Sequence, residues 1–275
     1  MSKGQPGRGS CARRSKPLLL GTAALLALGL LGCGRREEIS EAPEEALPPA
    51  NPTAKPVDPS TAGVISGFVR LEGTPPRMRT INMAAVPNCA KMHATPPMTQ
   101  DVLAGGDGAL QNVVVYLQGD FSSYSFSAVT TPVTIDQKGC MYVPRVVGLT
   151  AGTPLRIHNS DSATHNTYPL TQNNRQWNET QAVGGAPVER LFARPEVAIT
   201  LKCNLHPWMT AHVAVFSHPY FQVTGQDGSF KLKNVPPGPY TVAAWHERYG
   251  SSEQTVTLGP KGQEKVSITY QTGSR

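Results

Sequence analysis

The stretch from residue 229 to residue 245 reads SFKLKNVPPGPYTVAAW and holds two apolar–polar alternations separated by turn formers. Residues 229–235 alternate with period two, residues 240–245 begin a second run, and PPGP lies between them. Successive side chains of a strand point to opposite faces of the sheet. The stretch therefore predicts two half-buried strands joined by a tight connection.

Short runs of the same kind occur on both sides of this stretch. They lie at 64–73, 112–117, 254–258 and 265–270, with Gly, Pro, Asn or Asp residues between them. After Ala62 no segment shows apolar residues at helical spacing. Period two with turn punctuation is typical of β-sandwiches, and about 210 residues is a comfortable length for two of them. The predicted fold class is therefore all-β.

The N-terminal segment has the composition of a targeting signal. Five basic and no acidic residues occur within 1–16, an apolar run fills 18–32, and Cys33 follows. The run is too short for a comfortable membrane span. The residues LLGC at 30–33 resemble the lipobox of bacterial lipoproteins, in which the new N-terminal cysteine carries lipid. This resemblance implies a signal peptide over 1–32, a lipid on Cys33 and an extracytoplasmic protein anchored in the cell envelope.

Charge and composition exclude one class of partner and predict a linker. Residues 1–32 hold five of the 25 Lys and Arg and none of the 19 Asp and Glu, which leaves 20 basic against 19 acidic residues, a net charge of +1. A nucleic-acid partner would need a clustered basic face, so none is expected.

Residues 33–61 are rich in Pro, Glu and Ala. They predict a flexible linker, because they cannot bury enough apolar surface to offset the entropy lost on ordering.

The segment KCNLHPWM at 202–209 places Cys203, His206 and Met209 at intervals of three. A thiol, an imidazole and a thioether are ligands that copper prefers. Taken singly, each residue has a simpler explanation: a buried thiol, a surface histidine and a core-filling methionine. Together with His165 upstream they predict one copper site, with His165, Cys203 and His206 in a trigonal plane and Met209 as a weak axial ligand.

Other metal centres fit these residues less well. A binuclear copper centre would need a second Cys on the loop, and structural zinc usually has more thiols or paired His. Oxygen-reducing multicopper enzymes need His-x-His pairs, which the chain lacks, so we expect no enzyme activity. CAKMH at 89–93 lacks the second Cys of a haem attachment motif. The remaining histidines are expected to be surface or hydrogen-bonded residues: His158, His212, His218 and His246.

The cysteine count limits the disulfides. Cys11 is lost with the signal and Cys33 takes lipid, which leaves Cys89, Cys140 and Cys203. An extracytoplasmic compartment is oxidising and favours pairing of thiols. If a metal holds Cys203, then Cys89 and Cys140 are the pair, although sequence alone does not prove the connectivity.

Residues 128–219 resemble a cupredoxin, the small blue copper fold. PRVVGLTAGTPLRIHNSDSATHNTY, at 144–168, matches the early strand, the turn and the His-Asn pair of that family, here His165 and Asn166. CNLHPWM, followed by the strand AHVAVF, matches the ligand loop, with a Cys-x2-His-x2-Met spacing similar to that of amicyanin. The resemblance implies a type 1 copper ion and electron transfer. Asn166 would steady the two ligand loops by hydrogen bonds, and His206 would be the exposed electron port.

VTGQDGSFKLKNVPPGPYTVAAWHE, at 223–247, resembles the carboxypeptidase regulatory-like domain, a small prealbumin-like sandwich. Asp227 with Gly228 supplies one turn of its motif, and PPG supplies the next. Strands like the first two of that family occur at 64–73 and 110–119, before the cupredoxin-like stretch. We therefore predict that the cupredoxin is inserted into this sandwich; alternatively, residues 62–124 extend the cupredoxin. The role of the excursion at 74–109 is left open.

The predicted organisation has five parts: signal peptide (1–32), lipidated Cys and linker (33–61), first strands of the regulatory-like sandwich with the excursion (62–127), cupredoxin (128–219) and the remainder of the regulatory-like sandwich (220–272). The favoured function is lipid-anchored electron transfer to and from a redox partner protein. Copper trafficking with the same ligands is the first alternative. The second is a carbohydrate- or protein-binding module whose copper site is secondary.

Overall fold

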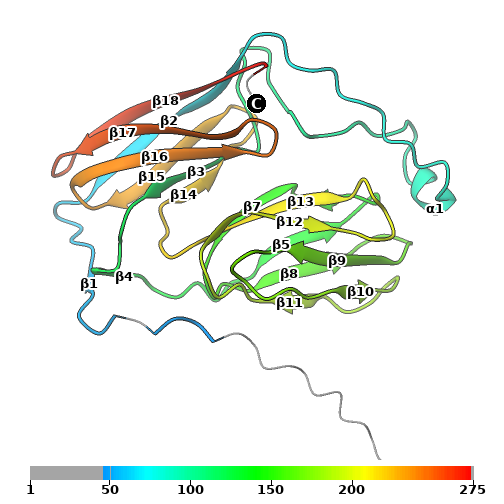
Figure 1. The fold of residues 1–275 in the computed structure, drawn as a ribbon, viewed down its shortest axis with the longest axis horizontal. Coiled ribbons are helices and arrows are strands. Elements are labelled where there is room, and N and C mark those ends of the chain that lie inside the picture. The colour runs from blue at the N-terminus through cyan, green and yellow to red at the C-terminus, as the bar shows by residue number, and fades with distance from the viewer. Residues whose placement is uncertain (1–45, 50, 274–275) are drawn as a thin grey trace, which may run out of the picture. The chain divides into compact units, whose positions relative to one another are not determined.

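The computed structural model describes residues 46–49 and 51–273 of the chain. Strands dominate these residues, and the helix among them, α1 (Pro87–Ala90), is only four residues long (Figure 1). The predicted all-β fold class is confirmed. Within the same ranges no helix is long and apolar enough to cross a membrane. The segment predicted to be a signal peptide and the predicted lipid site at Cys33 lie outside the described residues.

One sandwich is formed by strands from both ends of the described chain, and we call it the split sandwich. Its strands are β2 (Gly63–Glu72), β3 (Val114–Gln118), β14 (Phe221–Val223), β15 (Ser229–Val235), β16 (Gly238–His246), β17 (Gly250–Leu258) and β18 (Gln263–Gln271). They form one sheet in the order β15-β2-β18 and another in the order β14-β3-β16-β17 (Figure 1). Alternate apolar residues of both sheets, among them Ile65, Val115 and Phe230, make its core.

Pairing across the interruption confirms that the early and late strands share this sandwich. β2 pairs antiparallel with β15 and parallel with β18, and β3 pairs antiparallel with β14 and β16. The turn predicted between β14 and β15 is also present. Gly228 has φ +68°, a conformation that glycine adopts without strain, and Asp227 Oδ1 accepts a hydrogen bond from the Ser229 N–H at 3.0 Å.

The residues between β3 and β14 form a second unit, the inserted sandwich. Its strands are β5 (Val133–Gln137), β6 (Tyr142–Val143), β7 (Val146–Thr150), β8 (Leu155–Asn159), β9 (His165–Leu170), β10 (Glu179–Gln181), β11 (Val188–Arg190), β12 (Glu196–Lys202) and β13 (Thr210–Phe216). They form one sheet in the order β10-β9-β12-β13-β7 and another in the order β11-β8-β5-β6. Ile135, Leu155 and Leu201 lie in the core between these sheets.

The two sandwiches share a small apolar contact and a buried ion pair. Val114 of β3 packs in one cluster with Ala214 and Phe216 of β13. Beside it, Arg145 Nη2 donates to Glu247 Oε2 at 2.7 Å, and each of these side chains is only 12% exposed. A hydrogen-bonded pair with so little exposure is screened less by solvent than a surface pair.

The excursion at 74–109, which we call the strap, leaves the split sandwich after β2 and returns to it at β3. Ile81, Met83 and Cys89 of the strap are buried in the core of the inserted sandwich. The disulfide Cys89–Cys140 fastens the strap there, and Cys203 is a free, buried thiol. The predicted pairing is therefore confirmed, and the strap has a structural role that sequence left open: its buried residues belong to the core of the inserted sandwich.

The prediction of a flexible linker over 33–61 is wrong for residues 51–61, which make specific contacts with the folded chain. β1 (Lys55–Pro56) pairs with β4 (Tyr124–Ser125), and Asn51 Nδ2 donates to the Ser122 carbonyl at 2.9 Å. Composition missed this order because the contacts are backbone and side-chain hydrogen bonds, which need no large apolar residue.

Candidate metal centre

The four predicted ligands come from β9 and from the loop that joins β12 to β13. His165 is the first residue of β9, and Cys203 directly follows β12. β9 and β12 are antiparallel neighbours with Lys202 opposite Tyr168, so the start of one lies beside the end of the other. Beyond Cys203 the chain turns tightly, with the Met209 N–H donating to the His206 carbonyl at 2.9 Å. The fold thus brings a distant histidine to a local Cys-His-Met loop.

The donor atoms converge on one point. Nδ1 of His165 lies 2.9 Å from Nδ1 of His206, which lies 3.6 Å from Sγ of Cys203. All three donor atoms are within 4.8 Å of one another. Ligands bonded to one ion at about 2.0 to 2.3 Å stand roughly 3 to 4 Å apart, so the three atoms need only small shifts to hold a metal. The residues therefore fit the predicted copper ion.

Met209 lies in the same buried cluster as Cys203 and is 1% exposed. His165, Cys203 and His206 are also buried. The soft and borderline donors of this set are those that select copper among the first-row metals.

Asn166 connects the two ligand segments, as its position next to His165 predicted. Its Oδ1 accepts a hydrogen bond from the Asn204 N–H at 2.7 Å and lies 3.4 Å from Sγ of Cys203. Its Nδ2 donates to Asn178 Oδ1 at 2.7 Å, which fixes the orientation of the amide. The buried side chain therefore holds the end of β12 against the start of β9.

Electrostatics favours the metal-binding forms of Cys203 and His206, but not that of His165, whose pKa is raised. Burial alone would raise the pKa of the Cys203 thiol, but hydrogen bonds, first from His165 and then from nearby backbone, hold that pKa below its usual value. Burial would lower the pKa of His165, but its contacts with Asp161 and Cys203 raise it. Burial, followed by the charge of His165, lowers the pKa of His206. A thiolate and a neutral imidazole are the forms that bind metals.

Asp161 is the functional residue that sequence reasoning missed. Its Oδ2 lies 2.8 Å from Nε2 of His165, on the side of the ring away from the other donors. Burial would raise the pKa of Asp161, but the hydrogen bond to His165 and two backbone N–H groups lower it. One signal could have found it: Asp161 is the only acidic residue between β8 and β9, in the turn that leads to His165.

The expectation that His206 is exposed is wrong. Its side chain is buried, with 4% of the residue exposed, whereas the neighbouring Leu205 is 51% exposed. Sγ of Cys89 and of Cys140 lie within 4.8 Å of a ring nitrogen of His206, and the Trp208 ring lies 5.4 Å from the His206 ring. The strap and its disulfide cover the residue that would otherwise be the solvent edge of the site.

The other histidines have structural contacts. His212 Nε2 lies 3.3 Å from Glu247, and His158 Nδ1 lies 3.3 Å from Asp136. Burial lowers the pKa of His218 and of His246 to about 4, so both are neutral residues of the interior. In CAKMH, Cys89 is engaged in the disulfide and is therefore no haem or copper ligand.

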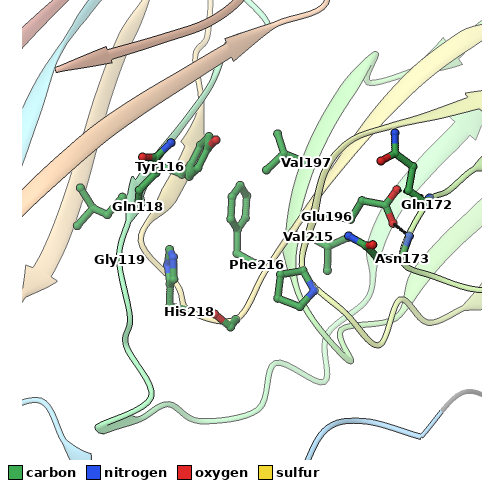
Figure 2. A pocket seen from close by; sticks show the side chains of 13 residues that line it. Tyr116, Gln118, Gly119, Gln172, Asn173, Glu196, Val197, Val215, Phe216 and His218 are labelled. Carbon is green, nitrogen blue, oxygen red and sulfur yellow. Dashed lines mark hydrogen bonds between the residues drawn. The ribbon is translucent and has the colours of Figure 1, made fainter.

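A cleft of about 460 Å³ lies elsewhere and contains none of the four predicted ligands. Figure 2 shows Tyr116 and Gln118 on one side and Gln172, Asn173 and Glu196 on the other. Glu196 accepts the backbone N–H groups of Gln172 and Asn173, so its carboxylate is already engaged. The cleft and the cluster of donor atoms thus lie at different places in the protein. The metal centre is assigned to the donor cluster, because buried side chains can hold an ion where there is no open cavity.

In comparisons with known proteins, one family model matches part of the chain. The family model of the carboxypeptidase regulatory-like domain matches residues 204–271, which include β14 to β18. No protein of curated function matches the chain.

Several solved structures with copper folds are similar to part of the chain. A purple cupredoxin from Nitrosopumilus maritimus is 23% identical over 30% of this chain and 97% of its own, with a TM-score of 0.26. The M98A mutant of amicyanin is 14% identical over 30% of this chain and 81% of its own, with a TM-score of 0.28. The copper-containing nitrite reductase from Thermus scotoductus SA-01 is 18% identical over 47% of this chain but only 29% of its own, with a TM-score of 0.30.

Proposed function

We propose that this protein transfers single electrons by means of one type 1 copper ion held by His165, Cys203, His206 and Met209. The observation that carries the proposal is the convergence of Nδ1 of His165, Nδ1 of His206 and Sγ of Cys203 at a buried point. Bound copper would supply reversible chemistry between Cu(I) and Cu(II), for which this mixed donor set is suited.

The chain's own contribution is to hold the donors still. Asn166 ties the Cys203 end of the loop to β9, and the turn between His206 and Met209 fixes the other end. When neither donor segment has to move, a change in the charge of the ion requires little rearrangement of the protein. Burial of all four donors leaves no exposed edge for a substrate, which favours electron transfer over catalysis.

Burial also distinguishes electron transfer from copper trafficking. A protein that hands over its metal needs donors that a partner can reach, whereas His165 is 0% and His206 is 4% exposed. The strap lies over the second of these and is held by a disulfide. We therefore favour a resident ion over an exchanging one.

The proposal includes the cell envelope as the site of action. A signal peptide over 1–32 and a lipid on Cys33 would anchor the protein to a membrane outside the cytoplasm, where a disulfide such as Cys89–Cys140 is stable. A redox protein would be its partner, and no nucleic acid is proposed.

Spectroscopy of the copper-loaded protein and its Cys203→Ser variant tests the function. The unaltered protein should show an intense visible thiolate band with one copper per chain, and Cys203→Ser should abolish the band because it removes the thiolate. His158→Ala, which changes a histidine of β8 outside the donor set, should leave the band unchanged. A colourless wild-type complex, or full colour in Cys203→Ser, contradicts the proposal. Loss of the copper to a chelator within seconds would instead favour trafficking.

A further inference from the structure

The Asp161 carboxylate makes three contacts that join a proposed copper ligand to a turn of the inserted sandwich. Its Oδ2 lies 2.8 Å from Nε2 of His165 and accepts the Cys140 N–H at 2.7 Å. Its Oδ1 accepts the Gly139 N–H at 2.6 Å. The side chains of His165 and Asp161 are 0% and 3% exposed. Both partners are thus removed from competing water.

The contact with Asp161 decides which nitrogen of His165 is free to bind a metal. An ionised carboxylate only accepts hydrogen bonds, so Nε2 of His165 must carry the proton. Nδ1 is then the nitrogen with an available lone pair, and it is the one that faces His206 at 2.9 Å. The two nitrogens of the ring are therefore assigned different roles by the protein.

Two backbone N–H groups also hold the carboxylate, and a further bond holds the backbone of Asp161. Gly139 and Cys140 both have positive φ, +63° and +53°, and this turn points two successive N–H groups at Asp161. The Asp161 N–H donates to Asn159 Oδ1 at 3.0 Å. Cys140 is in turn tied to the strap by its disulfide. The carboxylate cannot rotate away from His165 without breaking its bonds to the Gly139 and Cys140 N–H groups.

We propose that Asp161 is a positioning residue of the copper centre that selects Nδ1 of His165 as the donor and biases the centre toward Cu(II). The proposal rests on the proposed function. A negative charge near the ion favours its more highly charged state. A hydrogen bond from the outer nitrogen to a carboxylate also makes the imidazole a stronger donor. Both effects lower the reduction potential.

Replacing Asp161 by Asn tests the proposal, because Asn keeps the size of the side chain and removes its charge. In Asp161→Asn the thiolate band should persist while the redox equilibrium shifts at least tenfold toward Cu(I), a rise of about 59 mV for one electron. The matched control is Asp136→Asn. Asp136 Oδ1 lies 3.3 Å from Nδ1 of His158 in the same sandwich, and His158 is not a donor. This variant should leave the potential unchanged.

Nitrogen NMR of the Cu(I) form of the unaltered protein gives a second test that does not depend on the folding of a variant. His165 should show a proton on Nε2 and a metal-bound Nδ1. Metal on Nε2, or an Nε2 without a proton, overturns the proposal.

The electrochemical outcomes separate this inference from the proposed function. An unchanged potential in Asp161→Asn with a normal band overturns the inference alone, and so does an equal shift in Asp136→Asn, which would be a general charge effect. A wild-type protein without a thiolate band overturns both. If Asp161→Asn does not fold, the NMR result decides.

Discussion

Asn166 shows how single polar residues set the geometry of the proposed centre. Its carbonyl accepts a hydrogen bond from the buried Tyr142 hydroxyl at 2.9 Å, while its side chain bonds to Asn204 and Asn178. The residue next to one donor is thus joined to the loop that carries the others and to the core of the sandwich. A small side chain at this position would remove the partner of the Asn204 N–H and the bond between the two ligand segments.

Met209→Leu tests the axial ligand. A weak thioether stabilises Cu(II) slightly more than Cu(I), so its loss should raise the reduction potential, by about 59 mV for a tenfold change in the equilibrium. The band should remain, because Cys203 and both histidines are still present. Voltammetry of the two proteins measures the difference.

Met141→Leu is the matched control for this prediction, since Met141 packs against the same cluster but is not a proposed donor. It should leave the potential where it is. If Met209 were only core packing, the near-isosteric change would cost little stability and the two variants would have the same potential. That result would remove Met209 from the ligand set.

The donors were predicted from sequence, whereas Asp161 and the burial of His206 were missed. Cys203, His206 and Met209 lie on one short loop, so their spacing alone indicates a site. Asp161 contacts His165 four residues away but is held by the Cys140 N–H 21 residues away, and that second contact exists only in the folded chain. His206 is covered by the strap, whose Cys89 lies 117 residues earlier in the chain.

At the scale of elements, the long alternating runs were recognised and the strap was not. β15 spans Ser229–Val235 as its period-two pattern predicted, because one of its faces is buried and the other is not. The strap buries Ile81, Met83 and Cys89 in the core of the inserted sandwich. Their spacing is irregular because the strap is not a strand of either sheet of that sandwich. Its predicted disulfide gave the one correct indication of where it lies.

Removing the Cys89–Cys140 disulfide should destabilise the protein. The bond joins residues 51 positions apart, and closing a loop of that length lowers the entropy of the unfolded chain, which is worth about 4 kcal/mol. Cys89→Ala with Cys140→Ala should lower the free energy of unfolding by about this amount in a urea titration. Hydrogen exchange should increase in the strap and around His206.

The two single variants are the control for this prediction. Cys89→Ala and Cys140→Ala each break the same bond, so each should lower the stability nearly as much as the double change. A double variant as stable as the oxidised wild type would show that core packing alone holds the strap in place.

For the whole molecule, the contact between the sandwiches combines apolar packing with one charged group that serves both. Glu247 lies on the turn after β16 and bonds to Arg145 and His212 of the inserted sandwich. Burial would raise the pKa of Glu247, but the hydrogen bond and charge of Arg145, with His212, lower it to about 2 from an ordinary value of 4.5. The protonation of one carboxyl is therefore linked to the attachment of the two units.

Glu247→Gln should remove a pH-dependent part of the stability. A carboxyl whose pKa is depressed in the folded protein stabilises it above the unfolded pKa, and this contribution is lost as the pH falls from 4.5 to about 2. The shift corresponds to roughly 3 kcal/mol. The difference in unfolding free energy between wild type and variant should thus be largest near pH 7 and approach zero near pH 2.

Burial of His246, whose pKa is about 4, adds acid sensitivity between about pH 6.5 and 4; because the charge of Glu247 raises this pKa, the sensitivity should be somewhat greater in Glu247→Gln. Urea titrations at several pH values measure the difference, with Glu253→Gln, an exposed carboxyl of β17, as the control. A gap that stays constant from pH 7 to pH 2 would mean that Glu247 does not link the two sandwiches energetically.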